Sequence, residues 1–326
     1  MLRPLLSRLP ARIHGLYSRL ALPSTAPRPM PPARGMSTVS FSHGRQFTRK
    51  MQRSPWVTAA LVGIPLLGAG FILTHLEETE YTHRTRFIAV SPERELAMGL
   101  EYHKDVVKEA GNLVLPASAP RTRMVARVAS RIIAANNLKR NIDWEVTVVD
   151  KPIVNAFVVP GGKIVVYTGI IDVISTTKDP EGALAAILAH EVAHVILRHG
   201  AENVSWSYVI SALALATAAY FGISPDFTSS LGQLAFSLPH SRAAETEADV
   251  VGAELMARAC YSPVIASELW HHMDRIAPSS GFALLRTHPT NADRAAKLQV
   301  LYPQVQPVFL NCAEAFRHAI HHPKLA

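Results

Sequence analysis

Cysteine is scarce in this chain of 326 residues, which contains only Cys260 and Cys312. The two cysteines show no CxxC spacing and no zinc-finger histidine pattern nearby, so a cysteine-based zinc module is excluded. Two buried free thiols are the simpler expectation, and a single disulfide in an oxidising compartment stays open. The chain is long enough for one sizeable domain with appendages.

Acidic residues are absent from the N-terminal region, where the first one is Glu77. Residues 1–53 carry ten Lys or Arg against a net charge of +8 for the whole chain, which leaves −2 (8 − 10) for the rest. The basic charge is therefore terminal, and no nucleic-acid partner is expected. An acid-free segment rich in Arg and Ser predicts a mitochondrial transit peptide with a disordered linker over residues 1–45. A disordered basic tail is the alternative.

Charged residues are also missing from Trp56 to Leu73, which is apolar over eighteen residues. A membrane-spanning helix needs roughly 20 such residues, so a transmembrane helix is predicted over 56–75. A buried core helix is the alternative. Basic residues precede the segment and glutamates follow it, so the positive-inside bias puts its N-terminal side in the matrix if the membrane is the mitochondrial inner membrane. The remainder of the chain would then face the intermembrane space.

Patterning beyond residue 90 is typical of a folded domain, predicted over residues 90–320. The alternation of apolar residues and the turn signals predict two helices, one strand and a hairpin closed by "PGG". Their expected ranges are 92–110 and 121–137 for the helices, 144–149 for the strand, and 154–159 with 163–167 for the hairpin. The predicted fold class is α+β, mostly helical, with a small β-sheet beside the helix described next and one transmembrane helix before the domain.

The segment "AAILAHEVAHVILRHG" places polar groups on a core-like helix. Asp179 as N-cap, Pro180 at the first position and Gly200 beyond the end predict one helix from Pro180 to His199. His190 and His194 are four residues apart and lie on one face, so both imidazoles can reach one zinc ion.

Glu191 lies next to this pair, where a carboxylate can serve as base toward a water at the zinc. A bare HExxH motif also fits two ordinary core histidines. A third ligand from another segment is therefore needed to decide between the two interpretations.

A downstream helix, expected from Ser241 to Ala259, offers that ligand. Glu245 and Asp249 are four residues apart on one face, whereas Glu247 points elsewhere. Glu245 as third ligand, with Asp249 orienting a ligand histidine, completes a gluzincin set with one Zn²⁺ per chain. A solvated acidic face is the alternative.

Four motifs in order, "NAFVVPGGKIVVYTG", "HEVAHVILRH", "SRAAETEADVVG" and "THPTNADR", resemble the HtpX-like and CaaX-protease-related family of zinc metallopeptidases. The resemblance implies a membrane-anchored endopeptidase and assigns its residues. The implied zinc ligands are His190, His194 and Glu245, the base is Glu191, and the late His-Pro…Arg element supplies His288 and Arg294. His288 would approach the metal and either steady the tetrahedral intermediate or plug the site. A plain loop histidine before a proline is the alternative.

The glycine-rich hairpin has a possible role in binding substrate. An exposed strand edge beside the metal helix would let an extended peptide add as a further strand, with the scissile carbonyl over the zinc. The residues predicted for substrate binding are Asn155, Ala156, Phe157, Gly161 and Gly162. An ordinary core hairpin is the alternative.

A second apolar run, Val204 to Ile223, lies between His194 and Glu245, which must meet at one metal. A single membrane crossing there would separate them, so a buried or membrane-grazing helix is expected. Arg198 and His199 are expected to cap the preceding helix rather than to bind the metal.

The resemblance, together with the transit peptide, implies a mitochondrial inner-membrane protease. Its expected partners are membrane-protein or unfolded polypeptide substrates, and its expected role is protein quality control with stress-responsive processing of a fusion dynamin. A homo-oligomer stays open. The competing hypothesis is a non-catalytic chaperone or adaptor that holds a structural zinc with four protein ligands.

Overall fold

The computed structural model describes residues 55–79, 81–138, 142–222, 224, 238–276, 282–284, 288 and 292–321. The predicted transit peptide, residues 1–45, lies outside the described residues. The chain divides into two units, Met1–Pro65 and Leu66–Ala326, and the second contains the predicted domain.

A three-stranded sheet forms the smaller part of the domain. Its strands are β3 (Glu145–Val149), β4 (Ala156–Val159) and β5 (Lys163–Tyr167), in the order β3-β5-β4. β3 runs parallel to β5, and β4 runs antiparallel to it. Gly161 and Gly162 turn the hairpin at φ values of +90° and +76°, a region that favours glycine. The predicted strand and hairpin are therefore confirmed.

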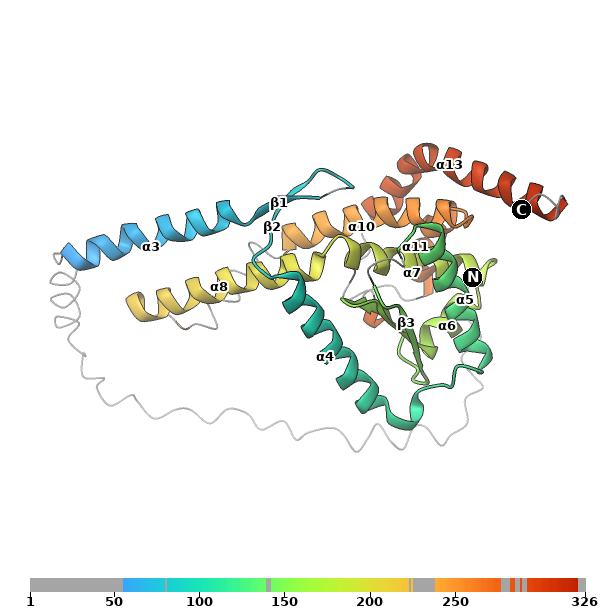
Figure 1. Ribbon diagram of the computed structural model, residues 1–326, viewed down its shortest axis with the longest axis horizontal. Helices are drawn as coiled ribbons and strands as arrows, with labels where there is room; N and C mark the ends of the chain where they lie inside the picture. Colours follow the sequence, from blue (N-terminus) through green and yellow to red (C-terminus); the bar gives the residue numbers. More distant parts are fainter. Residues whose placement is uncertain are drawn as a thin grey trace, which may run out of the picture. The chain divides into compact units, whose positions relative to one another are not determined.

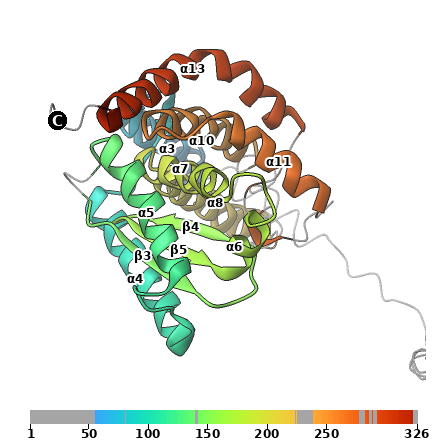
Figure 2. The same cartoon turned by 90° about the vertical axis from the view of Figure 1, so that its right-hand side faces the viewer.

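Helices cover both faces of this sheet (Figure 2). α5 (Pro120–Ala135) and α7 (Pro180–Ile196) share one core with alternate strand residues such as Val148 and Ile164. α4 (Pro92–Ala110) packs on the opposite face of the sheet, against the intervening strand residues Val149 and Val165. Because successive side chains of a strand alternate between faces, these short β-branched strands are buried on both sides. The α+β, mostly helical fold class is thereby confirmed.

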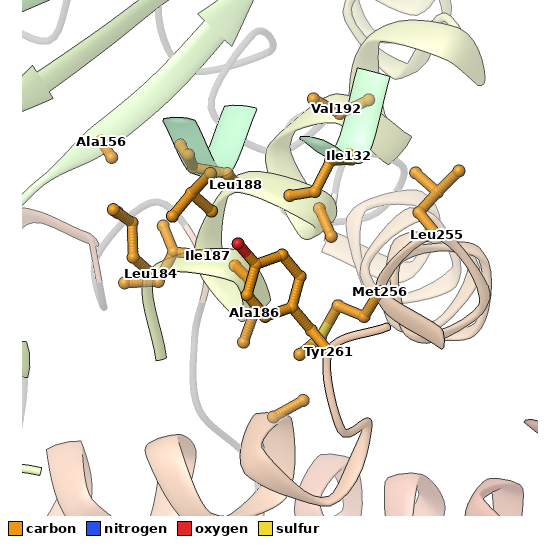
Figure 3. Packing of buried hydrophobic residues seen from close by; sticks show 14 of the residues in the cluster. Ile132, Ala156, Leu184, Ala186, Ile187, Leu188, Val192, Leu255, Met256 and Tyr261 are labelled. Atoms are coloured by element: carbon orange, nitrogen blue, oxygen red, sulfur yellow. The ribbon is translucent and has the colours of Figure 1, made fainter. Parts of the chain in front are cut away.

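A second helical layer lies against α7. It consists of α10 (Leu238–Arg258), α11 (Val264–Ile276) and α13 (Ala292–His321). Figure 3 shows side chains of α7, such as Leu188, filling the space between Ala156 of β4 and Met256 of α10. α7 is apolar nearly all round because it is enclosed by the sheet on one side and by helices on the other.

Two short elements complete the domain. The 3₁₀ helix η1 (Gly111–Leu113) leads from α4 toward α5, and α6 (Thr168–Ile174) follows β5.

The end of α7 differs from the sequence-based prediction. α7 ends at Ile196, and Arg198 takes a left-handed conformation at φ +55°. A separate helix, α8 (His199–Phe221), begins immediately after it and runs at 52° to α7 (Figure 1). Gly200 therefore lies in the first turn of α8, and the prediction that it ends one helix at His199 is wrong. Arg198 is held in this conformation because its guanidinium bonds to Glu95 at 2.7 Å and to the Val90 carbonyl at 2.9 Å.

The predicted membrane segment falls on α3 (Pro55–Thr74). Among the described residues, no single helix is long and apolar enough to cross a membrane, and the stretch Gly63–Thr74 is a shorter apolar helix. α7 and α8 taken together reach the required length and composition only as a bent pair. Ile210 of α8 is buried, whereas Leu213 and Leu215 are exposed by 51% and 65%. α8 is thus buried along only part of its surface.

The two cysteines form a disulfide, so the expectation of free thiols is wrong. Cys260 follows the end of α10, and Cys312 lies on α13, which packs against that helix. This packing brings their Cα atoms to 5.4 Å, within the usual range for a disulfide. The sequence pattern could not show this, because the pairing depends on a helix contact between distant segments.

Candidate active site

The HEVAH segment lies in the most enclosed helix of the domain. The Asp179 side chain caps α7 by accepting a hydrogen bond from the Gly182 amide at 2.9 Å. His190 and Glu191 are exposed by only 5% and 4%. Tight packing of α7 fixes the direction of these side chains, because core residues occupy single rotamers.

α10 brings Glu245 to the two histidines. It approaches α7 closely at Gly252, where an added Cβ would lie 3.2 Å from the backbone N and Cα of His190. The Glu245 carboxylate lies 3.3 Å from Nε2 of His190 and 3.4 Å from Nε2 of His194. The glycine at this crossing therefore sets the distance at which the acid meets the imidazoles.

His288 completes a cluster of four possible ligands. One ligand atom each from His190, His194, Glu245 and His288 lies within 4.8 Å of all the others. The two nitrogens Nε2 of His190 and His194 are 3.0 Å apart, and Nδ1 of His288 is 2.9 Å from Oε1 of Glu245. Ligand atoms around a tetrahedral zinc ion lie roughly 3.3 Å apart, given bonds of about 2.0–2.1 Å. The donor set and its spacing therefore fit zinc.

The surroundings set the charge states of these ligands. Burial lowers the pKa of His194 to about 3, which keeps its imidazole in the neutral form that binds metals. Burial acts in the opposite sense on Glu245, but hydrogen bonds from His190, His194 and His288 bring the pKa of its carboxyl well below the usual range. Glu245 is thus an anion next to a neutral imidazole, as in a zinc site of this type.

Asp249 and Arg294 support these ligands from behind. Oδ1 of Asp249 lies 3.1 Å from Nδ1 of His190, and Arg294 donates to both Asp249 oxygens at 2.8 Å. A second nitrogen of Arg294 lies 3.0 Å from Oε2 of Glu245. Burial lowers the pKa of His190, but the carboxylates of Asp249 and Glu245 together outweigh it and raise this pKa to about 9. The Asp249 carboxylate therefore faces Nδ1 of His190 as an acceptor, and Nε2 of His190 faces the cluster.

Glu191 contacts the cluster without belonging to the ligand group. Its Oε1 is buried and lies 3.2 Å from Nε2 of His288. His288 thus stands between two carboxylates, with Nδ1 toward Glu245 and Nε2 toward Glu191.

Two further residues at this site were assigned elsewhere on the basis of sequence. His199, expected only to cap a helix, places its Nδ1 2.8 Å from Nδ1 of His194. Glu247, expected to point away, lies 3.1 Å from Nε2 of His199 through Oε2. Five residues along a continuous helix correspond to a rotation of about 140°, so His199 would face away from His194. The bend at Arg198 brings the two rings together, and no sequence signal available here predicts that bend.

The side chains predicted to bind substrate point in different directions. Phe157 packs against Tyr102 and Tyr167, and Ala156 is buried in the core. Gly161 and Gly162 form the turn, where an added Cβ would lie 2.8 Å from the Leu96 side chain and 2.4 Å from the Ile142 side chain, respectively.

At the outer edge of β4, backbone groups rather than these side chains face outward. Asn155 and Val159 direct their carbonyls toward β5, so alternation directs the N–H and C=O of Ala156 and Val158 to the outer edge of β4. β4 is an edge strand in the sheet of the described residues.

A cleft of about 240 Å³ runs from this edge to the cluster. Its walls include Val158 and Pro160 on one side, and His194, Glu245 and His288 on the other. Asn203 of α8 also lines it and had no signal in the sequence. The cleft gives an extended chain access to the cluster.

Comparison with known proteins agrees with this geometry. Residues 119–301 match the model of peptidase family M48. The mitochondrial metalloendopeptidase OMA1 of Schizosaccharomyces pombe is 38% identical over 258 residues, which cover 78% of this chain and 74% of that protein. OMA1 of Saccharomyces cerevisiae is 30% identical over 73% of this chain and 72% of its own length. Human mitochondrial OMA1 is 29% identical over 80% of this chain and 53% of its own length. The chain therefore belongs to peptidase family M48 and is a metallopeptidase.

Proposed function

We propose that this enzyme is a zinc-dependent endopeptidase anchored in the mitochondrial inner membrane. The observation that carries the proposal is the cluster of His190, His194, Glu245 and His288, with the Glu191 carboxylate beside it. His190, His194 and Glu245 would hold the ion. Zinc bound there would polarise the scissile carbonyl and lower the pKa of the attacking water.

Glu191 is the general base in this proposal. It takes the proton of the attacking water on a carboxylate oxygen and returns it to the leaving amine. Its buried position gives it access to the cluster and little contact with solvent. His288, which touches both Glu191 and Glu245, would donate a hydrogen bond to the developing oxyanion.

The substrate is an extended or unfolded segment of a membrane protein. Outward backbone groups of Ala156 and Val158 would pair with it along the edge of β4, and the cleft beside Val158 leads it to the cluster. Its physiological task would be quality control and stress-responsive processing of a fusion dynamin, as the resemblance of the four sequence motifs implies.

Residues 1–45 would comprise a transit peptide and a disordered linker, and residues 56–75 would form the anchor. The basic flank before α3 favours the matrix for the N-terminal side. The domain over residues 90–320 then faces the intermembrane space. The disulfide between Cys260 and Cys312 supports an oxidising location, because such bonds are rare in the cytosol.

The test is Glu191→Gln in the full-length protein, assayed on an unfolded inner-membrane substrate. Loss of a general base lowers kcat by roughly 10²- to 10⁴-fold, while zinc content stays at the wild-type level. Glu181→Gln is the matched control, because Glu181 lies on the same helix but is exposed and pairs with Arg127. Cleavage by a folded, zinc-loaded Glu191→Gln protein at the wild-type rate would refute the mechanism.

The non-catalytic adaptor with four protein ligands, an alternative at the level of sequence, finds no support, because the chain belongs to a peptidase family.

A further inference from the structure

An arginine of the hairpin that precedes the domain contacts α8 and α10. The hairpin consists of β1 (Leu76–Glu78) and β2 (Thr85–Phe87), and Arg84 directly precedes β2. The Arg84 guanidinium donates to both oxygens of Glu202 on α8 at 2.7 and 2.6 Å. Its Nε donates to Oε2 of Glu247 on α10 at 2.8 Å. Figure 1 shows this hairpin beside α8 and α10.

The two acids are buried, so their charges depend on these contacts. Glu202 and Glu247 are exposed by only 2% and 5%. A carboxylate buried without a partner costs several kcal/mol. Thr79 and Thr82 of the hairpin also donate to Oε1 of Glu247. An arginine, two hydroxyls and His199 thus surround the Glu247 carboxylate at hydrogen-bond distance, which is the environment of an ionised acid.

Glu247 in turn fixes the proton position on His199. The ionised carboxylate can only accept, so Nε2 of His199 carries the proton that is donated to it at 3.1 Å. Nδ1 of His199 is then a bare acceptor, and it lies 2.8 Å from Nδ1 of His194. His194 must donate from Nδ1, which leaves its Nε2 lone pair directed at Glu245 and His190.

The opposite arrangement would disable the site. If Nδ1 of His199 carried a proton, Nδ1 of His194 would have to accept it. A neutral His194 would then be protonated at Nε2 and could not ligate a metal through that atom. Only one arrangement of donors and acceptors between Arg84 and His194 is therefore compatible with a metal at the cluster.

We propose that Arg84 is a positioning residue for catalysis, which acts through Glu247 and His199 to hold His194 in its metal-binding tautomer and orientation. The inference rests on the proposed role of His194 as a metal ligand. It assigns a part of the active site to the hairpin between α3 and α4, outside residues 119–301 that match the family model.

Arg84→Met in the full-length protein in detergent tests this inference, and Arg86→Met is the matched control. Arg86 lies on the same hairpin and is buried, whereas Arg84 is half-buried. Arg86 donates to Glu77, at 2.8 Å from Nη2, and contacts neither Glu202 nor Glu247 in the described hydrogen bonds. Both changes remove a guanidinium from one hairpin, so they separate hairpin destabilisation from loss of the connection to His194.

Two readouts are measured for each variant. The first is the visible spectrum and the chelator-induced release rate of cobalt(II) bound in place of zinc. The second is kcat and KM on an unfolded peptide. Arg84→Met is expected to shift the cobalt spectrum, to accelerate metal release and to lower kcat about 10- to 100-fold, with KM nearly unchanged. Arg86→Met is expected to leave the spectrum and the release rate at wild-type values.

Equal cobalt spectra and release rates for wild-type and Arg84→Met proteins would overturn the inference, as would equal changes in both arginine variants. If Arg84→Met does not fold, Arg84→Lys is measured in the same way, because lysine keeps the charge but lacks the fork that serves two carboxylates. A wild-type protein that binds no cobalt and cleaves nothing would instead reject the proposed function.

Discussion

At the scale of single residues, His103 is a buried histidine outside the active site. It lies on α4, is exposed by 7%, and bonds to the Thr147 hydroxyl at 3.0 Å through Nε2. Burial is the main cause that lowers its pKa below the ordinary value of 6.5, with a smaller contribution from Lys163. The folded protein therefore binds this proton more weakly than the unfolded chain.

This difference predicts how stability depends on pH. As pH falls below about 6.5, the unfolded state takes up a proton at residue 103 that the folded state does not, so the free energy of unfolding decreases. His103→Gln should lose less stability between pH 7 and pH 5 than the wild type, measured by urea unfolding. His271→Gln, at an exposed position on α11, should keep the wild-type pH dependence. Identical slopes for His103→Gln and the wild type would contradict the prediction.

The residue scale also shows what a sequence can reveal about this site. A helical spacing of four residues, visible in the sequence, relates His190 to His194 and Glu245 to Asp249. The structure brings these four side chains together. His199 has no such spacing, because its position depends on a left-handed residue that is not glycine. Arg84 and Glu247 meet across 163 positions of chain, which no local pattern encodes.

At the scale of elements, the crossing of α7 and α10 determines the distance between the ligands. An alanine methyl at position 252 would lie 3.2 Å from His190, too close for an ordinary contact. Gly252→Ala should therefore separate the helices, withdraw Glu245 from the histidines, and lower zinc affinity about tenfold with a loss of about 1–3 kcal/mol in stability.

Competition with a chelator and thermal unfolding measure these effects. Gly200→Ala is the matched control, since an added methyl group there meets nothing within 4 Å. Unchanged zinc affinity in Gly252→Ala would show that the crossing can adjust without moving the ligands.

The edge of β4 gives a second prediction at this scale. Val158→Pro removes an outward N–H that no strand of the described sheet uses, and proline is tolerated at such edges. One lost hydrogen bond to substrate, worth about 1 kcal/mol, should lower kcat/KM about fivefold. Val158→Thr keeps the N–H and a similar shape and serves as the control. Equal kcat/KM values for both variants would argue against pairing along this edge.

Elements with local signals were predictable. The strands and the hairpin follow from alternating β-branched residues and from "PGG", and α4 begins with its Ser91 cap and Pro92. The junction of α7 and α8 was not predictable, because Gly200 offered a common helix end while the contacts of Arg198 with Glu95 and Val90 decided the outcome. These tertiary contacts outweighed the local preference for a helix end at Gly200.

At the scale of the whole molecule, the disulfide connects the end of α10 to α13. It closes a loop of 52 residues, which restricts the unfolded chain and contributes up to about 4 kcal/mol to stability. Replacing both cysteines by serine should lower the Tm of the full-length protein by roughly 10 °C. Reductant should lower the Tm of the wild type to a similar extent and leave the double variant unchanged. A wild-type Tm that does not respond to complete reduction would contradict this prediction.

The arginine shared by two acids constrains which sequences this fold can accept. One guanidinium pairs with both Glu202 and Glu247, so the residues at positions 84, 202 and 247 depend on one another. Removing Arg84 alone leaves two buried carboxylates without their shared cation, whereas apolar residues of similar volume at all three positions leave no buried charge. In a library that randomises these positions, folded members with an acid at 202 or 247 should therefore keep arginine at 84, and the other folded members should be apolar at all three. If the proposed connection to His194 holds, only the charged group should also retain proteolysis, so selection for folding and selection for activity would yield different sequences at the same three sites.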